Sequence, residues 1–555
     1  MASNDPGFGV PAIEDMKKGS IDAGDGMSAS EETRPVAPDQ FDPRYETTKW
    51  EIWAYYAYYI GNNGLTLFNF APTAFQNLLY QAAGDSEVLH FAGRDRTINS
   101  IVLLANGISF AIQIVLFLII GSYADFGRSR PNILIVLSVV AFAIGFGWLG
   151  VHQASKWEVA LGMYIVGLIA YQTTLTFWTA AFPGLARNTS QLRTQAEEYN
   201  AGRISRDEYD YADTMQRSRL SNMAFYIQSC GEIVILALIV GILYGVNVRG
   251  SEANNNWGLS VLIAFATGVW LVLAIPWFVL EKRRPGQAVP PNMNIVVVGF
   301  WQLYRLVYLR ASIPYFSNAK SAICSRAITQ IWRLKQSLIY LIGYFLLGDS
   351  LNTTVTVVAT LQNSVVEYDT LTLTYLFLEG IGAQAVGIYS FWWIQQRYKL
   401  GTKTMFNAIA VGIILLDGWG MVGVWTQNFG FHHVWEFWLY QAFYGLFVCP
   451  WYSYSQIMIS EVTPRGKEFL FFSLFSIIGK TSSFIGPLVS SAIIDASPHG
   501  NNSTPFYFLF SLSSASFLLL LLFVDLKKSR AEQTRFLEEE DFLRAKLAMG
   551  DSTGS

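Results

Sequence analysis

The feature that most constrains the fold is a pair of long apolar runs, residues 98–122 and 131–152, with only a short polar joint between them. A helix needs about 20 apolar residues to cross a bilayer, and each run meets that length. The joint, GSYADFGRSRP at 121–131, is so short that the two helices must form an antiparallel hairpin. Because it carries Arg128 and Arg130, the joint is expected to face the cytosol.

Ten further apolar runs are predicted to be membrane spans. Hydrophobic residues make up 52% of the 555-residue chain and charged residues only 14%, whereas soluble domains carry about 25% charged residues. The chain is therefore predicted to be an all-α polytopic membrane protein. Its twelve expected spans are 50–80, 98–122, 131–152, 157–181, 219–246, 257–280, 335–360, 371–396, 402–425, 434–459, 467–494 and 505–526.

Basic residues are distributed unevenly between the two sides of the predicted membrane. Nine Lys and Arg lie in 282–335 and six in 182–219, both on the side of the 121–131 joint. Cytoplasmic loops carry the excess of Lys and Arg, so the joint and both termini are expected in the cytosol. The opposite loops hold only Arg94, Arg96, Lys156 and Arg249.

The longest loop, residues 282–334, divides the predicted spans six and six. We therefore expect an N-terminal half at 49–281 and a C-terminal half at 335–526. Two such halves imply alternating access around a site near the middle of the membrane. Segment 292–310 of the loop is apolar with basic residues at its end, which indicates a helix lying on the cytosolic membrane surface.

Three segments outside the spans are polar. Residues 1–48 are rich in Gly, Pro, Asp and Ser and are predicted to be a disordered cytosolic tail. The loop 182–218 is expected to be helical in part and to serve as a regulatory or spacer segment. Residues 527–555 form a charged cytosolic tail that is expected to be helical at its start.

Charged side chains inside the predicted spans are the main indication of transport. A charge at the centre of a membrane helix costs about 2.5–3.5 kcal/mol on insertion scales. Each such group must therefore face a cavity or a partner, or stay neutral, and helix–helix contact is an equally good interpretation for any single one. The residues are Glu232, Asp349, Glu379, Asp417 and Lys480.

Spans 1 and 7, which correspond in the two halves, each contain a polar interruption that begins with glycine. The first holds Asn62 and Asn63, and the second holds Asp349 and Asn352. Matched interruptions are a strong sequence indication of a transporter site, because broken backbone offers N–H and C=O groups to a substrate. The asparagines are suited to the carboxylate or ammonium of a zwitterion, and Asp349 to an ammonium or a proton.

Polar and aromatic residues of spans 4 and 10 are further candidates for lining the same cavity. Ordinary helix contacts are the favoured interpretation for them. They are Tyr171, Gln172, Thr173, Thr174, Trp178, Gln441, Tyr444 and Tyr452.

The spacing within the first joint follows the pattern G-x-x-x-D-x-G-R, from Gly121 through Asp125 and Gly127 to Arg128. This pattern resembles the loop between helices 2 and 3 of major facilitator superfamily transporters. It departs from the usual form, which has two residues between the aspartate and the glycine. Six plus six spans with a long central loop is also the layout of that superfamily.

Longer motifs lie in spans 1, 7 and 11: YYAYYIGNNG, FNFAPTAFQNLL, GYFLLGDSLNTTV and SEVTPRGKEFLFFSLFSIIGKTSSFIGPLV. They resemble the fungal autophagy-related vacuolar effluxer family, a branch of the major facilitator superfamily, and the resemblance covers roughly residues 45–530. Membership implies a protein of the vacuole membrane that exports amino acids, leucine among them, to the cytosol after autophagic breakdown. The substrate is implied by the resemblance alone.

Charged residues near the joint and at the start of span 11 lie on the same predicted face. Asp125 and Arg128 belong to the joint, and Arg465 and Lys467 open span 11. We expect Asp125 to pair with a basic group of one of these stretches. Such a pair would act as a gate that steadies one access state.

Two features concern the lumenal loops. Asn501 and Asn502 begin overlapping sequons and are the candidate glycosylation sites, whereas sequons at Asn188 and Asn352 are expected to stay bare because of their placement. All five histidines also fall in or beside these loops, and their reference pKa of about 6.5 would let an acidic lumen charge them. The adjacent pair His432 and His433, within a turn of Glu436, is the candidate pH sensor, with unremarkable loop histidines as an equal alternative.

Other function classes find little support. No HExxH, GxSxG or Walker motif and no paired Cys/His set occurs, so no enzyme activity, metal or cofactor is expected. The net charge of −3 gives no indication of nucleic-acid binding. We expect a monomer in the bilayer that handles amino acids, with protons as a candidate coupling ion. The alternatives are a plasma-membrane major facilitator transporter for another nutrient or drug, and a multi-pass receptor or membrane-embedded enzyme.

Overall fold

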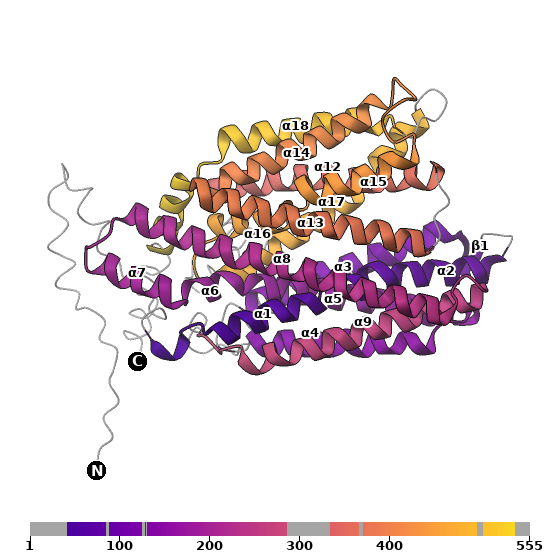
Figure 1. Ribbon diagram of the computed structural model, residues 1–555, viewed down its shortest axis with the longest axis horizontal. Coiled ribbons are helices and arrows are strands. Elements are labelled where there is room, and N and C mark those ends of the chain that lie inside the picture. The colour runs from indigo at the N-terminus through magenta and orange to yellow at the C-terminus, as the bar shows by residue number, and fades with distance from the viewer. Residues whose placement is uncertain are drawn as a thin grey trace, which may run out of the picture.

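The computed structural model is an elongated bundle of nearly parallel and antiparallel helices in two groups (Figure 1). The N-terminal group, indigo to magenta, lies below the C-terminal group, orange to yellow. This arrangement agrees with the two halves expected from the sequence. The structure describes residues 42–84, 88–124, 128, 130–285, 334–365, 370–496 and 503–538.

The N-terminal half places six helical segments where spans 1 to 6 are predicted. The segment for span 1 is divided, because the π-helix η3 separates α1 from α2. The bounds are α1 Lys49–Gly61, η3 Leu65–Phe70, α2 Ala71–Ala83, α3 Ile98–Ala124, α4 Arg130–Gly147, α5 Trp157–Ala180, α8 Arg206–Val246 and α9 Glu252–Leu280.

The C-terminal half likewise places six helical segments at spans 7 to 12. Here the segment for span 10 is divided, again by a π-helical stretch. The bounds are α12 Lys335–Val365, α13 Thr370–Tyr398, α14 Thr402–Val422, α15 Val434–Phe443, η8 Tyr444–Val448, α16 Pro450–Val462, α17 Glu468–Ala496 and α18 Pro505–Phe523.

Eight helices in the part of the chain that the structure describes are long and apolar enough to cross a membrane. They correspond to spans 2 to 7, 9 and 12. Spans 1 and 10 are divided, so neither of their helices reaches the necessary length alone. The twelve-span prediction is consistent with this structure.

The predicted interruption in span 7 is wrong. Helix α12 runs without a break from Lys335 to Val365, straight through Gly348 and Asp349. A single glycine and an aspartate weaken a helix only modestly, and packing against its neighbours outweighs their propensities. The second interruption lies instead in span 10, at Tyr444–Val448, so the two breaks occur in spans 1 and 10.

The halves meet chiefly where α8 packs on α13 and α3 packs on α17, with further contacts of α16 with α8 and of α17 with α5. Small residues permit the close approach: a side chain on Gly121 of α3 would overlap Ser473 of α17. The α8–α13 pair is antiparallel, because Tyr226 packs on Tyr389 while Ser229 accepts a hydrogen bond from Gln384 Nε2 at 2.9 Å. Both halves are therefore in direct contact through most of the bundle length.

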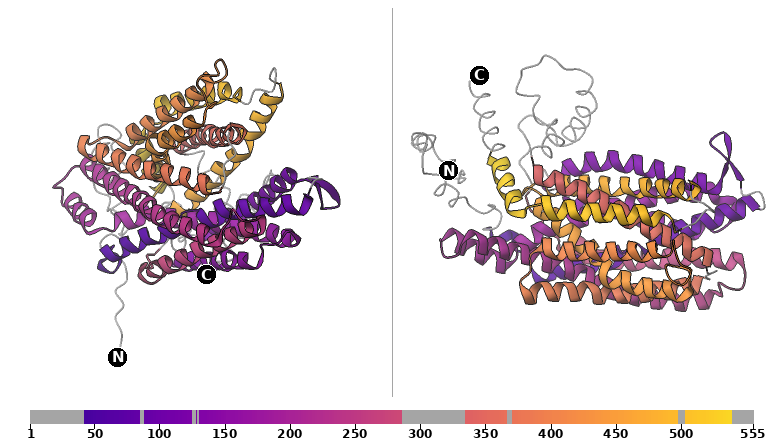
Figure 2. Two further views of the ribbon diagram at one scale, coloured as in Figure 1. Left: turned by 45° about the vertical axis from the view of Figure 1, so that its right-hand side comes forward. Right: turned by 90° about the horizontal axis from the view of Figure 1, so that it is seen from above.

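One end of the bundle, which we call the basic end, carries Arg187, Arg284 and Arg465. There α6 (Phe182–Arg187) and α7 (Ser190–Asn200) precede α8, at the left of Figure 1. Helix α8 begins early because Ser205 and Glu208 form a capping box, so the 182–218 segment is largely helical and the prediction of partial helicity is confirmed. Residues 526–538 are also helical and follow α18 at this end (Figure 2).

The opposite end carries a β-hairpin that the sequence did not lead us to expect. Strands β1 (Val88–Phe91) and β2 (Arg94–Thr97) pair antiparallel. The two residues between them, Ala92 and Gly93, have φ of 51° and 74°, and positive φ at both positions is what a two-residue type I′ turn requires. Four-residue strands leave almost no periodic signal. The predicted surface helix at 292–310 lies outside the described residues. Of the tail predicted at 1–48, residues 1–41 also lie outside them, whereas residues 42–48 include the short 3-10 helix η2 (Pro43–Tyr45).

Candidate functional site

The break in span 1 is built by three consecutive residues. Asn62 caps the end of α1, and Gly64 has φ of 96°, in the left-handed region that favours glycine. The Asn63 Oδ1 atom accepts a hydrogen bond from Leu65 N at 2.9 Å and starts the π-helical stretch. A Cβ atom on Gly64 would also lie 2.8 Å from the Tyr171 hydroxyl, so span 4 packs tightly on the break.

Asn62 leaves an acceptor unused at this break. Its side chain is buried, and its amide donates to Thr174 Oγ1 at 3.4 Å. Its Oδ1 atom has no hydrogen-bond partner among the described residues. An unpaired buried carbonyl oxygen is costly unless a ligand or water supplies a donor. Asn62 is therefore suited to accept from an ammonium group.

Four tyrosines and a glutamate from both halves lie beside this break. We call them the central cluster; they are Tyr59, Tyr171, Glu232, Tyr444 and Tyr452. Glu232 of α8 is buried and accepts from Gln228 one turn earlier. It lies close enough to Tyr59 and Tyr171 to interact electrostatically with both. Tyr452 interacts with the same two tyrosines from the C-terminal half, so the cluster bridges the halves.

Tyr452 shows that part of the central cluster is accessible. It is 42% exposed although Tyr344, Tyr440 and Tyr444 all lie around it. Its hydroxyl lies 3.0 Å from that of Tyr444, which belongs to the π-helical break of span 10. The two breaks therefore contribute to one region: Asn62 and Gly64 from span 1, and Tyr444 from span 10.

The structure does not join Asp349 to the span 1 break. Asp349 is buried on α12 and accepts from Gly486 N of α17 at 3.1 Å, within the C-terminal half. Asn62, in contrast, bonds to Thr174 within the N-terminal half. Asp417 is the partner of residues that flank Asp349, since its carboxylate accepts from Ser350 Oγ at 3.1 Å and Thr354 Oγ1 at 2.5 Å. Asp417 therefore acts as a contact between α12 and α14.

The other predicted pathway residues have mixed surroundings. Gln172 is buried in α5, and Gln441 packs over Gly380 of α13, where a Cβ would meet its Oε1 atom at 2.9 Å. Asn352 is exposed on α12. Glu379 of α13 has a buried carboxylate oxygen, Oε2, without a hydrogen-bond partner among the described residues. The predicted set is thus spread over both halves rather than gathered at one point.

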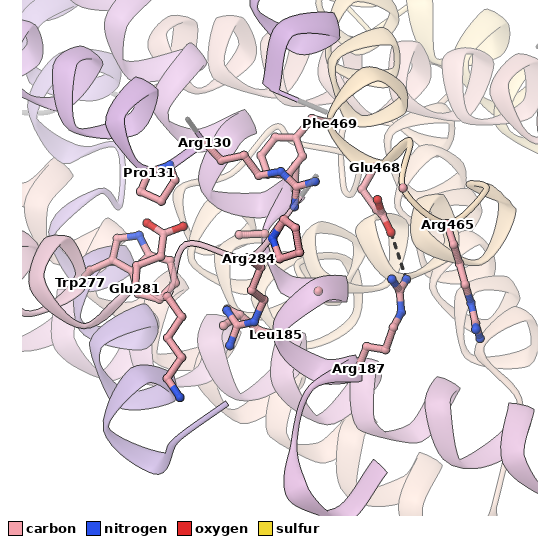
Figure 3. Close-up of a pocket in the computed structure, with 16 residues that line it drawn as sticks. Arg130, Pro131, Leu185, Arg187, Trp277, Glu281, Arg284, Arg465, Glu468 and Phe469 are labelled. Atoms are coloured by element: carbon pink, nitrogen blue, oxygen red, sulfur yellow. Dashed lines mark hydrogen bonds and ion pairs between the residues drawn. The ribbon is translucent and has the colours of Figure 1, made fainter. Parts of the chain in front are cut away.

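Ion pairs connect the two halves at the basic end. Arg187 Nη2 lies 3.0 Å from Glu468 Oε1, between α6 and α17 (Figure 3). Glu461 of α16 accepts from Thr214 Oγ1 at 2.7 Å and lies 3.2 Å from Arg217 Nη2, both on α8. These contacts hold the basic end closed in this conformation.

The helix after α18 adds to this closure. Arg530 donates to Glu461 Oε2 at 3.1 Å and to Asp210 Oδ2 of α8 at 3.2 Å. Burial by itself would lower the pKa of Arg530, but Glu461 and Asp210 outweigh that effect and raise the pKa. Arg530 therefore stays charged and ties the C-terminal segment to both halves. Toward the opposite end, the hydroxyls of Tyr244 and Tyr375 lie 3.3 Å apart.

The residues predicted to form the gate make longer contacts than these ion pairs. Arg128 donates to the Tyr45 hydroxyl at 3.4 Å, and Arg465 lies 4.0 Å from Asp213 Oδ2. Lys467 is buried at the start of span 11. Asp125, whose pairing was expected, lies outside the described residues.

The predicted pH sensors are held mainly through their backbone. Glu436 is buried, and its Oε1 atom accepts from His432 N at 3.1 Å and from His433 N at 3.2 Å. The His432 ring contacts Gly423 O through Nε2 at 2.9 Å. Glu436 therefore fixes the loop before α15 rather than pairing with an imidazole. The candidate glycosylation sites Asn501 and Asn502 lie outside the described residues.

Sequence reasoning missed several residues that the structure brings together. Arg187 and Arg217 occur in the loop that is expected to be a regulatory or spacer segment, and Arg530 occurs in the charged tail. Glu461 and Glu468 flank Arg465 and Lys467, the basic pair predicted to form the gate. The signal available in the sequence was the density of charged residues in EVTPRGKE, 461–468, which indicates ion pairs with other segments. Across the described residues, no group of three His, Cys, Asp or Glu side chains could hold a metal ion.

Comparison with known proteins shows the family. A model of the family described as "Vacuole effluxer Atg22 like" matches residues 47–534. Autophagy-related protein 22 of Pyricularia oryzae is 22% identical over 481 residues, which cover 80% of this chain and 68% of that protein. The protein of the same name from Pichia angusta is 25% identical over 487 residues, with 84% and 82% covered.

Solved structures show the fold. The proton:xylose symporter XylE of the major facilitator superfamily aligns with a TM-score of 0.56 and 12% identity, covering 86% of this chain and 95% of XylE. The Escherichia coli fucose:proton symporter FucP aligns with a TM-score of 0.51 and 12% identity, covering 85% and 97%. The expected major facilitator fold is confirmed. The chain belongs to the family of Atg22-like vacuole effluxers.

Proposed function

We propose that this chain exports neutral amino acids, leucine among them, from the vacuole to the cytosol by alternating access. The observation that carries the proposal is the buried, unpaired Oδ1 atom of Asn62 at the break in span 1, beside the central cluster. The description of the family as vacuole effluxers supports the compartment and the direction. The proposed location is the vacuole membrane, with the basic end and both termini in the cytosol.

The central cluster has the chemistry that an amino-acid zwitterion needs. Asn62 Oδ1 and the Glu232 carboxylate are acceptors for an ammonium group. Tyrosine hydroxyls such as that of Tyr452, 42% exposed, can donate to a carboxylate. The rings of Tyr59 and Tyr171 offer apolar surface to a side chain such as that of leucine. Few polar groups set in an aromatic lining are typical of small-molecule sites.

The gate follows from the ion pairs at the basic end. Because Arg187–Glu468 and Arg217–Glu461 join the halves there, this conformation corresponds to a state closed to the cytosol. Export requires those pairs to separate after a substrate has entered from the lumen. Alternating access by movement of one half against the other provides that step.

Asp349 is proposed as the group that responds to protons or to the substrate amine. It lies beside the contacts of Asp417 with Ser350 and Thr354, so a change of its charge would alter the packing of α12 on α14 and α17. The protein is proposed to work as a monomer, and protons are the proposed coupling ion.

The test is leucine counterflow in liposomes that contain the purified chain. Radiolabelled leucine is expected to accumulate in liposomes preloaded with unlabelled leucine, and Asn62→Ala should abolish that accumulation. The matched control is Asn256→Ala. Asn256 is a buried asparagine of the same half whose Oδ1 atom also lacks a partner among the described residues, but its amide donates to Gln81 at 2.5 Å, away from the central cluster, so only position distinguishes the two variants. No counterflow by the wild-type chain, or equal loss in both variants, would contradict the proposal.

A further inference from the structure

A cavity of about 360 Å³ lies at the basic end, between the two halves (Figure 3). Its size falls in the range of small-molecule pockets. Arg130, Trp277 and Lys282 line it from the N-terminal half, and Arg465 and Phe469 line it from the C-terminal half. It is separate from the central cluster, because its walls are the ends of α4, α9 and α17.

The lining of this cavity carries an excess of positive charge. Its basic residues are Arg130, Arg187, Lys282, Arg284 and Arg465, and its acidic residues are Glu281 and Glu468. Glu468 is occupied by Arg187 at 3.0 Å. Burial, together with repulsion from the Glu51 carboxylate, raises the pKa of Glu281 to about 8, so little negative charge from it remains near neutral pH.

Not all of these cations are equally available to a ligand. Arg284 forms a bidentate pair with Glu51 at 2.8 and 2.9 Å and is committed to the fold. Arg130 donates through Nε to Ala124 O at 2.9 Å, and its guanidinium lies over the Phe469 ring. The Lys282 ammonium contacts a backbone carbonyl, that of Glu46, and Arg465 lies 4.0 Å from its acidic neighbour Asp213.

A buried donor also lines the cavity without a partner. The Trp277 side chain is fully buried, and its Nε1 atom has no hydrogen-bond partner among the described residues. The Nε1 atoms of Trp148, Trp270 and Trp392 lack a partner among the described residues in the same way, so the case for a bound anion rests on the cations that line the cavity. An anion in the cavity would offset the excess of positive charge in its lining.

We propose that this cavity binds a phosphate-bearing anion, which bridges Arg130 and Lys282 of the N-terminal half to Arg465 of the C-terminal half. Arginine binds phosphate through two parallel hydrogen bonds, and lysine acts as a point charge beside it. The phosphate belongs either to the headgroup of a lipid or to a soluble phosphorylated metabolite. Because the ligand touches both halves only when the basic end is closed, its binding stabilises the closed state and slows transport.

The test measures binding by the purified full-length chain in two arms. In the first, the chain in phosphatidylcholine nanodiscs is titrated calorimetrically with inositol trisphosphate and with inorganic phosphate. In the second, the chain in phosphatidylcholine nanodiscs is compared with the chain in nanodiscs that also contain increasing amounts of a phosphatidylinositol phosphate, and native mass spectrometry measures the lipid that stays bound. Saturable binding of at least one probe is expected. A phosphatidylinositol phosphate that stays bound and displaces inositol trisphosphate identifies a headgroup, whereas binding in the soluble arm alone identifies a metabolite.

Single variants test the bridge. Arg130→Gln and Arg465→Gln are each expected to weaken binding at least about tenfold, because each removes a charge-assisted hydrogen bond. Arg397→Gln is the matched control, since Arg397 is an exposed arginine at the last turn of α13, outside the cavity. This variant should bind the phosphate probes with the same affinity as the wild type. Thermal melting of each variant checks folding. Arg465→Gln is expected to melt at the same temperature as the wild type, because the Arg465 side chain is 34% exposed in a loop.

The proposal is overturned if no probe binds saturably in either arm. It is also overturned if both variants bind as the wild type does, or if only one of the two weakens binding, because a bridge needs both halves. These outcomes do not depend on leucine transport, so they are distinguishable from failure of the proposed export function.

Discussion

Glu461→Gln is the substitution that most directly weakens the contacts that close the basic end. The Glu461 side chain is 1% exposed and the Arg217 side chain 8%. One carboxylate oxygen binds Thr214 and Arg217 of α8, and the other binds Arg530. Since α16 and α8 belong to different halves, the bonds of Glu461 to Thr214 and Arg217 exist only while the basic end is closed.

The size of the effect can be worked from these contacts. Removing one partner of a buried ion pair costs about 3–5 kcal/mol. Glutamine keeps one oxygen acceptor, and Asp213 still holds Arg217 at 2.9 Å, so we expect a loss of about 2 kcal/mol from the closed state. At about 1.4 kcal/mol per factor of ten, that shifts the equilibrium roughly 30-fold toward a state open at the basic end.

The assay is double electron–electron resonance between spin labels on the two halves. Labels on Cys at positions 203 and 398 would report the separation, because Arg203 and Tyr398 are exposed at the basic end, in a background without the native cysteines. Glu461→Gln should add or strengthen a longer distance, and Glu252→Gln, an exposed change at the opposite end, should not. A distance distribution for Glu461→Gln identical to that of the wild type would refute the reasoning.

Three further predictions concern charge. Asp349→Asn should reach the membrane normally but lose leucine transport in liposomes, because an amide oxygen can still accept from Gly486 N while the charge is gone; wild-type transport would contradict this. The pKa of Glu281 is raised by burial to about 8, so the stability it contributes is fully present below its unfolded-state value and is lost as pH rises toward 8. Glu281→Gln should therefore flatten the fall of Tm between about pH 5 and 8, and an unchanged slope would count against the assignment. The double change His432→Gln, His433→Gln should alter the dependence of efflux on lumenal pH, and an identical pH profile would remove the pair as sensors.

Much of the fold could be predicted because hydrophobic length is a local property. Apolar runs of bilayer length mark helices regardless of tertiary contacts, and basic residues in loops indicate which ends lie together. The break at Asn62 was also predictable, since adjacent asparagines between Gly61 and Gly64 oppose a continuous helix. The break at Tyr444–Val448 was missed, although Gly445 within it and Pro450 shortly after it are local signals of an interrupted helix.

The site could be predicted less well because it depends on packing between distant segments. Asp349 and Asn62 sit in corresponding spans, yet each bonds within its own half. Glu461 and Glu468 lie beside the residues predicted as a gate, but their partners, Arg217 and Arg187, come from segments more than 240 residues away in the chain. Pattern and charge alone do not determine which of several cations faces a given carboxylate.

The central claim is that this chain moves amino acids out of the vacuole through the region around Asn62. The most direct measurement is efflux of radiolabelled leucine from isolated vacuoles with and without the chain, at controlled pH on both sides. We predict faster efflux with the wild-type chain and efflux at the background rate with Asn62→Ala, when both are present in equal amounts. Efflux that is the same with and without the wild-type chain would contradict the account.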